Sequence, residues 1–197
     1  MSLIVFLALV GQGACIAAAT AGEPSANPTA MPFMSGGTIQ IKIKQGEAQV
    51  VGVAGEAIKV SWHSKDADEE PDVHVKVQRS GDKEATVLVD GPGNHVTYRV
   101  EVPQRSDVAV HMRAGDLTVQ GIVGSMDADL IAGNLEVSVP DPKRYRSVAA
   151  SVTAGEITAK PWRTDTGGLW RSLKLTGDGD YDLRARVIAG QLTIRGE

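Results

Sequence analysis

The stretch that decides the fold is the hexapeptide A-G-D-L-T-V at Ala114–Val119, which recurs three more times. The other copies read A-G-N-L-E-V at Ala132–Val137, A-G-E-I-T-A at Ala154–Ala159 and A-G-Q-L-T-I at Ala189–Ile194. Each copy has a small residue, a glycine and a polar residue, followed by an aliphatic–polar–aliphatic alternation that is typical of a β-strand. The sequence therefore predicts repeated strands across the second half of the chain.

The spacing of the repeat glycines predicts how these strands are arranged. Gly115 and Gly133 are 18 residues apart, and Gly133 and Gly155 are 22 residues apart. A period near 20 residues is typical of the coils of a solenoid, which stack to bury a shared apolar column. Glycine suits the sharp corner of each coil because it tolerates a positive φ. We expect an all-β, single-stranded β-solenoid whose corners are these residues: Gly115, Gly133, Gly155, Gly179 (in a degenerate copy, G-D-Y-D-L) and Gly190.

The first half of the chain also predicts strands, but without a clear repeat. Thr38–Lys44, Val73–Val77 and Val96–Val102 alternate between aliphatic and polar residues. A tight turn, G-P-G-N at Gly91–Asn94, precedes the last of them and favours an antiparallel arrangement. We therefore expect one domain over residues 37–197, with a more antiparallel N-terminal half.

The N-terminal segment has the pattern of a secretory signal peptide. Residues 1–21 carry no charge, include an apolar run at Leu3–Val10, and end in A-T-A at Ala19–Ala21. The apolar run is shorter than the roughly 20 residues that a transmembrane helix needs, so no transmembrane span is predicted. We expect export to the periplasm or the cell surface, followed by a flexible linker at 22–36. Cys15 is the single cysteine, and we interpret it as part of the apolar region, with a lipid anchor as the alternative.

Composition narrows the function classes. The formal net charge of −4 argues against nucleic acid as a partner, because nucleic-acid binding needs clustered Lys and Arg. Aromatic residues make up 4% of the chain, which predicts a narrow aliphatic core. The sequence does not indicate an oligomeric state.

No motif in the sequence indicates catalysis, a cofactor or a metal. A nucleophile elbow, a phosphate-binding loop and the H-E-x-x-H zinc motif are all absent. Asp178, Asp180 and Asp182 resemble the start of a calcium loop, but Leu183 and Ala189 stand where such a loop needs Gly and Glu. We predict a protein that is not an enzyme, with no catalytic, cofactor or metal-binding residues.

Two tryptophans lie in an insertion between repeat copies. Trp162 and Trp170 fall within Lys160–Arg171, which also contains Gly167-Gly168. One interpretation is a lid that closes the apolar column. The other is a contact with a ligand or partner, because exposed aromatic side chains suit sugar rings and protein interfaces.

The repeated A-G-[DNEQ]-[LI]-x-[VAI] motif, together with L-T-G-D-G-D-Y-D-L at Leu175–Leu183, resembles a bacterial family described as "putative adhesin" or toastrack-type β-helix, a domain of unknown function. The resemblance covers roughly residues 36–196 and implies an exported β-solenoid of the cell envelope. It implies no catalytic residues. The function expected from it is binding to an envelope or cell-surface protein or glycan. Two alternatives remain: a stress-sensor domain acting with a membrane signalling partner, and a polysaccharide-acting β-helix enzyme.

Overall fold

The computed structural model describes residues 27–65, 71–93 and 95–196 of the 197-residue chain. The described part is built from β-strands and two single-turn 3-10 helices, which confirms the all-β prediction. The elements are β1 Thr29–Pro32, β2 Thr38–Val53, β3 Ala57–Ser64, β4 His74–Arg79, β5 Glu84–Asp90, β6 Val96–Pro103, β7 Asp107–Gln120, β8 Met126–Val139, η1 Pro142–Arg144, β9 Tyr145–Ala159, η2 Lys160–Trp162, β10 Thr164–Thr176 and β11 Tyr181–Gly196.

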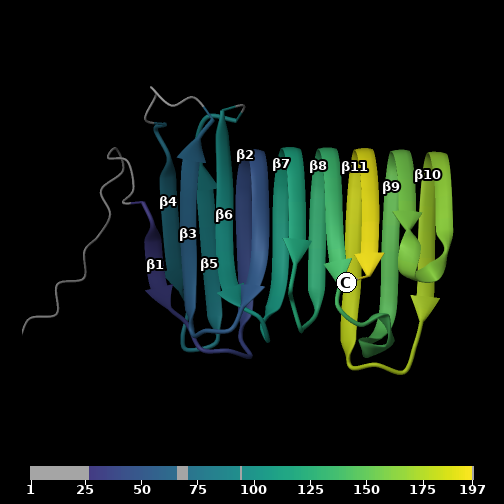
Figure 1. Cartoon of the computed structure of the whole chain (residues 1–197), viewed down its shortest axis with the longest axis horizontal. Coiled ribbons are helices and arrows are strands. Elements are labelled where there is room, and N and C mark those ends of the chain that lie inside the picture. The colour runs from purple at the N-terminus through teal and green to yellow at the C-terminus, as the bar shows by residue number, and fades with distance from the viewer. Residues whose placement is uncertain (1–26, 66–70, 94, 197) are drawn as a thin grey trace, which may run out of the picture.

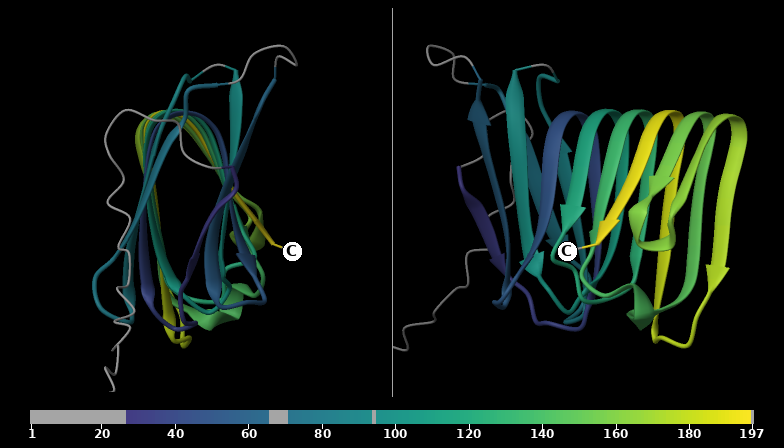
Figure 2. Two further views of the ribbon diagram at one scale, coloured as in Figure 1. Left: turned by 90° about the vertical axis from the view of Figure 1, so that its left-hand side faces the viewer. Right: turned by 45° about the vertical axis from the view of Figure 1, so that its right-hand side comes forward.

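The long strands, β2 and β7 to β11, each fold over near their middle and form an arch. In β7, Val110 and Met112 are buried before the bend, and Leu117 and Val119 are buried after it. The alternation changes phase at Gly115, so that both halves of the strand direct their aliphatic side chains into the same interior. Figure 2 shows the result in its left panel, where the arches superpose as one flattened outline around the core.

The arches stack side by side within one continuous sheet. The order is β2-β7-β8-β11-β9-β10, and every neighbouring pair is parallel except β9 and β10, which are antiparallel (Figure 1). The arches are therefore not stacked in chain order. The C-terminal strand β11 lies between β8 and β9, so the repeat copies around Gly133 and Gly155 are separated by the copy around Gly190.

The N-terminal end of the sheet divides into two faces. The first half of β2 pairs in parallel with β5, whereas its second half pairs in parallel with β6. β4 then pairs with β5 on one face, and β3 and β1 follow β6 on the other, all in antiparallel fashion. The predicted antiparallel character of this half therefore applies to these outer strands and not to β2.

The core is aliphatic within the stack and aromatic at the N-terminal end. Tyr145 is the one aromatic residue among the buried side chains of β7, β8, β9 and β11, which are otherwise aliphatic or methionine. Phe33, Trp62 and Tyr98 are all buried between the two faces of the N-terminal end. The narrow arches are filled mainly by aliphatic side chains, and most of the larger aromatic ones fill the space where the two faces separate.

Two sequence-based boundaries need correction. The predicted linker at 22–36 contains strand β1, which pairs with β3, and Phe33, which is buried in the core. The predicted insertion at Lys160–Arg171 is a loop only briefly, because β10 begins at Thr164 and pairs along β9. The predicted signal peptide at 1–21, including Cys15, lies outside the described residues. Within the described part, no helix has the length and apolarity to cross a membrane.

Candidate functional site

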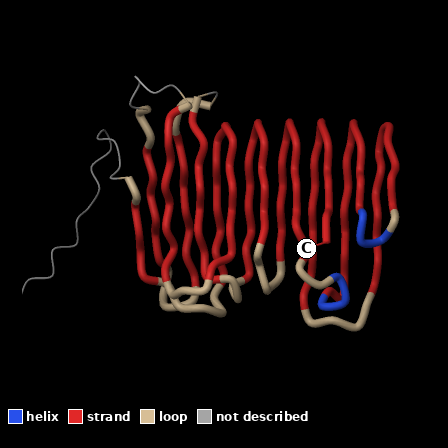
Figure 3. Tube along the Cα trace, viewed as in Figure 1, coloured by secondary structure: helices blue, strands red, loops and turns tan. Residues whose placement is uncertain are grey.

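The arches meet along a ridge, here called the crest, where the strands fold over without a loop (Figure 3). One glycine from each arch lies on it with a φ between 119° and 144°, a range that L side chains rarely adopt. Strand pairing aligns these glycines across the sheet. This glycine row consists of Gly46, Gly115, Gly133, Gly190, Gly155 and Gly168.

The glycine row is required by close contact between neighbouring arches. A Cβ atom on Gly133 would overlap the carbonyl oxygen of Gly115, and one on Gly190 would overlap that of Gly133. The same holds for Gly155 against Gly190. Four of the five predicted corner residues therefore lie in this row, next to a backbone neighbour that leaves no room for a side chain.

The fifth predicted corner, Gly179, lies elsewhere. It belongs to the turn between β10 and β11, and a Cβ atom there would overlap the backbone of Arg144. Because Gly179 has no side chain, this turn can lie directly against η1. Gly168 and Gly46 are the row members that lie outside the five predicted corners.

Apolar side chains are exposed beside the glycine row. Ile131 in β8 and Ile188 in β11 are neighbours, because the flanking residues of the two strands pair in register. Leu169 and Trp170 follow in β10, with β9 between β11 and β10. The exposed fractions are 50% for Ile131, 44% for Ile188, 67% for Leu169 and 79% for Trp170. We call these four residues the crest patch.

The two predicted contact residues, Trp162 and Trp170, have different environments. Trp162 ends η2 and is half-buried, with its side chain packed against the core. Trp170 is highly exposed and has a φ of 54°, which is rare for a bulky residue. Trp162 is thus packed against the core and Trp170 is not, and a ligand or partner contact stays a prediction. Strained backbone of this kind is concentrated at functional sites.

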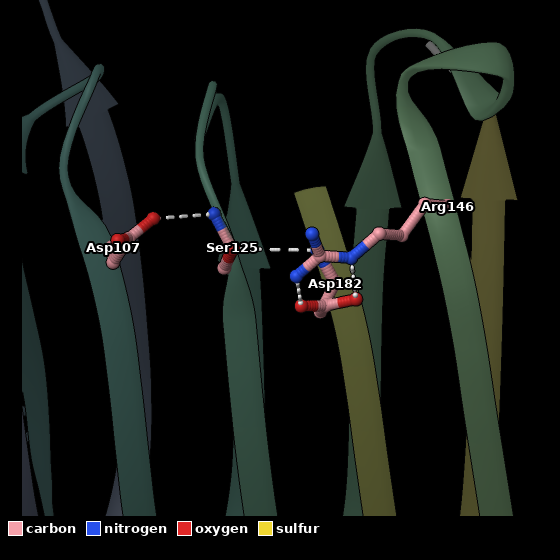
Figure 4. Close-up of polar contacts among 4 residues, drawn as sticks. All are labelled: Asp107, Ser125, Arg146 and Asp182. Carbon is pink, nitrogen blue, oxygen red and sulfur yellow. Dashed lines mark hydrogen bonds and ion pairs between the residues drawn. The ribbon is translucent and has the colours of Figure 1, made fainter. Parts of the chain in front are cut away.

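A chain of polar contacts crosses the opposite margin of the stack, where the long strands begin (Figure 4). Asp107 accepts a hydrogen bond from the Ser125 amide at 2.7 Å, and the Ser125 hydroxyl accepts one from the Asp182 amide at 3.3 Å. Arg146 donates to the Asp182 carboxylate, with its Nε 3.0 Å from Oδ1. These contacts join β7, β8, β11 and β9 in turn.

This polar chain is suited to holding strands together. The hydrogen bond from Arg146 holds the pKa of the Asp182 carboxyl below its ordinary value, and the same bond raises the pKa of Arg146. Asp182 is therefore an ionised carboxylate whose two oxygens both accept from a guanidinium. Across the described residues, no group of three or more His, Cys, Asp or Glu side chains has an arrangement that could hold a metal ion.

Charged side chains on the outer face link β8 to its neighbours. Asp129 lies 3.0 Å from Arg186 in β11 and 3.3 Å from His111 in β7. Asp127 Oδ1 lies 4.0 Å from Arg184, which is beyond hydrogen-bond distance. Burial raises the pKa of Asp127, and the neighbouring Asp129 raises it further. The acidic residues thus lie on β8 and their basic partners mainly on β11.

No protein-family model matches the chain, and no curated protein matches its sequence. Among solved structures, the chain is similar to a "putative cell adhesion protein" from Clostridium sporogenes ATCC 15579. The identity is 12%, the match covers 86% of this chain and 99% of that one, and the TM-score is 0.49. It also matches a "putative adhesin" from Parabacteroides merdae ATCC 43184 at 11% identity, covering 88% of this chain and 98% of that one, with a TM-score of 0.28.

Proposed function

We propose that this chain is an exported, non-catalytic protein of the cell envelope or cell surface that binds a protein or glycan partner through the crest patch. The observation that carries the proposal is the exposure of Ile131, Ile188, Leu169 and Trp170 beside a rigid glycine row. The four side chains lie along one ridge, with β9 between Ile188 and the β10 pair. Exposed apolar side chains gathered on one surface mark interaction sites, because leaving them in water is unfavourable.

The shape of the crest supports a binding role. The strands run over it without loops, and the glycine row holds neighbouring arches in tight contact. A rigid surface loses little conformational entropy on binding, so more of the contact energy contributes to affinity. Trp170 adds the large, amphipathic side chain that is enriched in interface hot spots.

The proposal takes the stack of arches to be a β-solenoid in which one strand has been inserted out of order. Parallel, in-register pairing of β2, β7 and β8, with glycine above glycine, supports this interpretation. Export rests on the signal-peptide pattern at 1–21. The non-catalytic assignment is supported by the pairing of Asp182 with Arg146, which occupies the carboxylate in a strand-to-strand contact.

The test is retention of partners from fractionated envelope of the source cell by the purified chain, identified by mass spectrometry and glycan analysis. The double variant Ile131→Lys/Ile188→Lys should reduce retention about tenfold or more, because it places two charges in the apolar contact. The matched control, Thr118→Lys/Thr193→Lys, adds the same charges to the outer face beyond the bend and should leave retention unchanged.

A wild-type chain that retains nothing above background would overturn the proposal. Equal retention by the crest variant and the control would overturn the assignment of the crest patch. Retention of a membrane-embedded signalling protein would identify the partner class as a sensor system. Turnover of a glycan panel would contradict the non-catalytic assignment.

A further inference from the structure

The strand β10 forms a long open edge of the sheet. Its 13 residues pair only with β9 in the described structure, whereas the edge strands at the other end, β1 and β4, have 4 and 6 residues. Nearly every side chain of β10 is exposed. A long edge strand presents unpaired backbone N–H and C=O groups to which another strand can add.

The arch shape of β10 fixes the register of any strand that adds to it. Thr166 before the bend and Arg171 after it are both exposed, but they stand on the inward side of the strand, because they pair with the buried residues Ile157 and Val152 of β9. An added arch must place its own bend over that of β10 and direct its inward residues to the same side. The pair β9–β10 obeys this rule in antiparallel fashion, with Thr166 opposite Ile157 and Arg171 opposite Val152.

The same rule can be applied to a second β10. Antiparallel pairing with coincident bends places Thr166 of one copy opposite Arg171 of the second copy. It then places Gly168 opposite Leu169, and Gly167 opposite Trp170, each twice by symmetry. The two largest exposed side chains of the edge thus lie across from the two residues that have no side chain. A large residue opposite glycine is a favourable cross-strand arrangement, since it covers the exposed backbone.

From this self-complementarity we propose that two copies of the chain associate through β10, related by a two-fold axis at the bend. Charge supports the pairing, because Asp165 lies diagonally across from Lys174 of the second copy, within reach of a long side chain. The association closes after two copies, since the β10 edge of each copy is used up by the other. The association does not require the partner proposed above, although it uses Leu169 and Trp170 of the crest patch, and it joins the two crest patches into one longer ridge.

Arg171 controls access to this edge. Its Nε donates to the Gly167 carbonyl at 2.9 Å, and its guanidinium lies over Gly168, where the next arch would place its own backbone. A charged side chain in this position opposes strand addition. Because the side chain is exposed, it can move away when a second copy arrives. Removing it should therefore favour association.

Sedimentation velocity of the full chain tests the proposal over a dilution series. We expect a monomer–dimer equilibrium, weakened about tenfold or more by Trp170→Lys, where a charge replaces the central aromatic residue. Arg171→Ala should tighten the dimer. Ile188→Lys is the matched control, because it puts the same charge on the crest two strands away and should leave the dimer unchanged. Circular dichroism checks that each variant is folded.

Cross-linking tests the register itself. In a Cys15→Ser background, the double variant Asp165→Cys/Ser172→Cys should form an intermolecular disulfide on mild oxidation, because the proposed register places these residues opposite each other. Neither single variant should do so, since identical positions then lie on opposite legs of the arch, with their side chains facing away from each other. A chain that stays monomeric up to about 100 μM, or a dimer that Trp170→Lys does not weaken, would overturn the proposal.

Discussion

The glycine row ends differently at its two ends. At the N-terminal end, Gly46 faces the aromatic ring of Tyr98, which is fully buried. At the other end, Gly168 faces the guanidinium of Arg171, an exposed side chain of the same strand. One end is closed by a ring within the core, and the other is covered by a flexible charged group.

The difference shows how a stack of arches can be terminated in two ways. The Tyr98 ring cannot leave without opening the close-packed core, so no arch can add beyond β2. There the sheet divides into two faces that end in the short strands β1 and β4. The Arg171 side chain can move without disturbing the core. The end formed by β10 is therefore the one at which the stack can be extended.

The largest effect expected from this comparison comes from adding a side chain within the glycine row. Gly133→Val should cost more than about 4 kcal/mol of unfolding free energy, because the side chain overlaps the Gly115 carbonyl and φ is 126°. Gly168→Val should cost about 1–3 kcal/mol, because φ is also positive but only Arg171 lies above it. Urea unfolding measures both losses. Equal losses would show that the two positions do not differ as proposed.

A second comparison concerns the core at the middle and at the end of the stack. Leu192→Ala in β11 removes a fully buried side chain between two arches and should cost about 2–5 kcal/mol. Leu173→Ala in β10 removes a half-buried side chain at the end and should cost less than about 1 kcal/mol. The check is again urea unfolding with a fixed m-value. If Leu173→Ala lost as much unfolding free energy as Leu192→Ala, the core at the β10 end would be packed as tightly as the core in the middle of the stack.

The burial of Tyr98 at the N-terminal end of the glycine row should make the stability of the protein depend on pH. Burial raises the pKa of Tyr98 from 10.0 to about 12. Both states hold the proton below pH 10, so stability is unaffected there. Above pH 10 the unfolded chain loses the proton first, and stability should fall by about 2–3 kcal/mol as the pH approaches 12.

Tyr98→Phe separates this effect from other alkaline titrations. The variant keeps the ring against Gly46 and loses only the hydroxyl, which makes a long 3.4 Å contact with the Pro92 carbonyl. Urea unfolding of both proteins at pH 9 and pH 11.5 gives the difference. Parallel declines of wild type and variant would rule out Tyr98 as the cause.

The sequence predicted the β-strands and the repeat glycines because both are local properties. Strand β10 was missed as an arch because it runs antiparallel to β9, so its residues follow the motif in reverse order. Leu169, Gly168 and Gly167 face Ala154, Gly155 and Glu156, and a forward search for A-G-x does not find them. Strand β1 was missed because four residues are too few for an alternation to be recognised.

The stacking order could not be predicted from a period, because any A-G copy fits the glycine row beside any other. The charges of the outward-facing residues indicate which strands are neighbours, which the repeat period does not. Strand β8 reads D-A-D from Asp127, and β11 reads R-A-R from Arg184, so that opposite charges face each other when these two strands are neighbours. Strand β9 has Ala149 and Ser151 at the same positions. Placing β9 directly beside β8 would leave Asp127 and Asp129 without their arginine partners on β11.

The smallest expected effect tests whether this charge pattern selects the place of β11 inside the stack and so leaves β10 at its end. Asp129 and Arg186 are 3.0 Å apart and partly exposed, so a double-mutant cycle with Asp129→Asn and Arg186→Gln should give a coupling of about 0.5–1 kcal/mol. The coupling should shrink in 1 M salt, where the Debye length is about 3 Å. A cycle of Asp129→Asn with Lys174→Gln, on β10 and three strands away, should give none. Absence of coupling between Asp129 and Arg186 would mean that packing alone places β11 between β8 and β9, and that the end of the stack is not selected by charge.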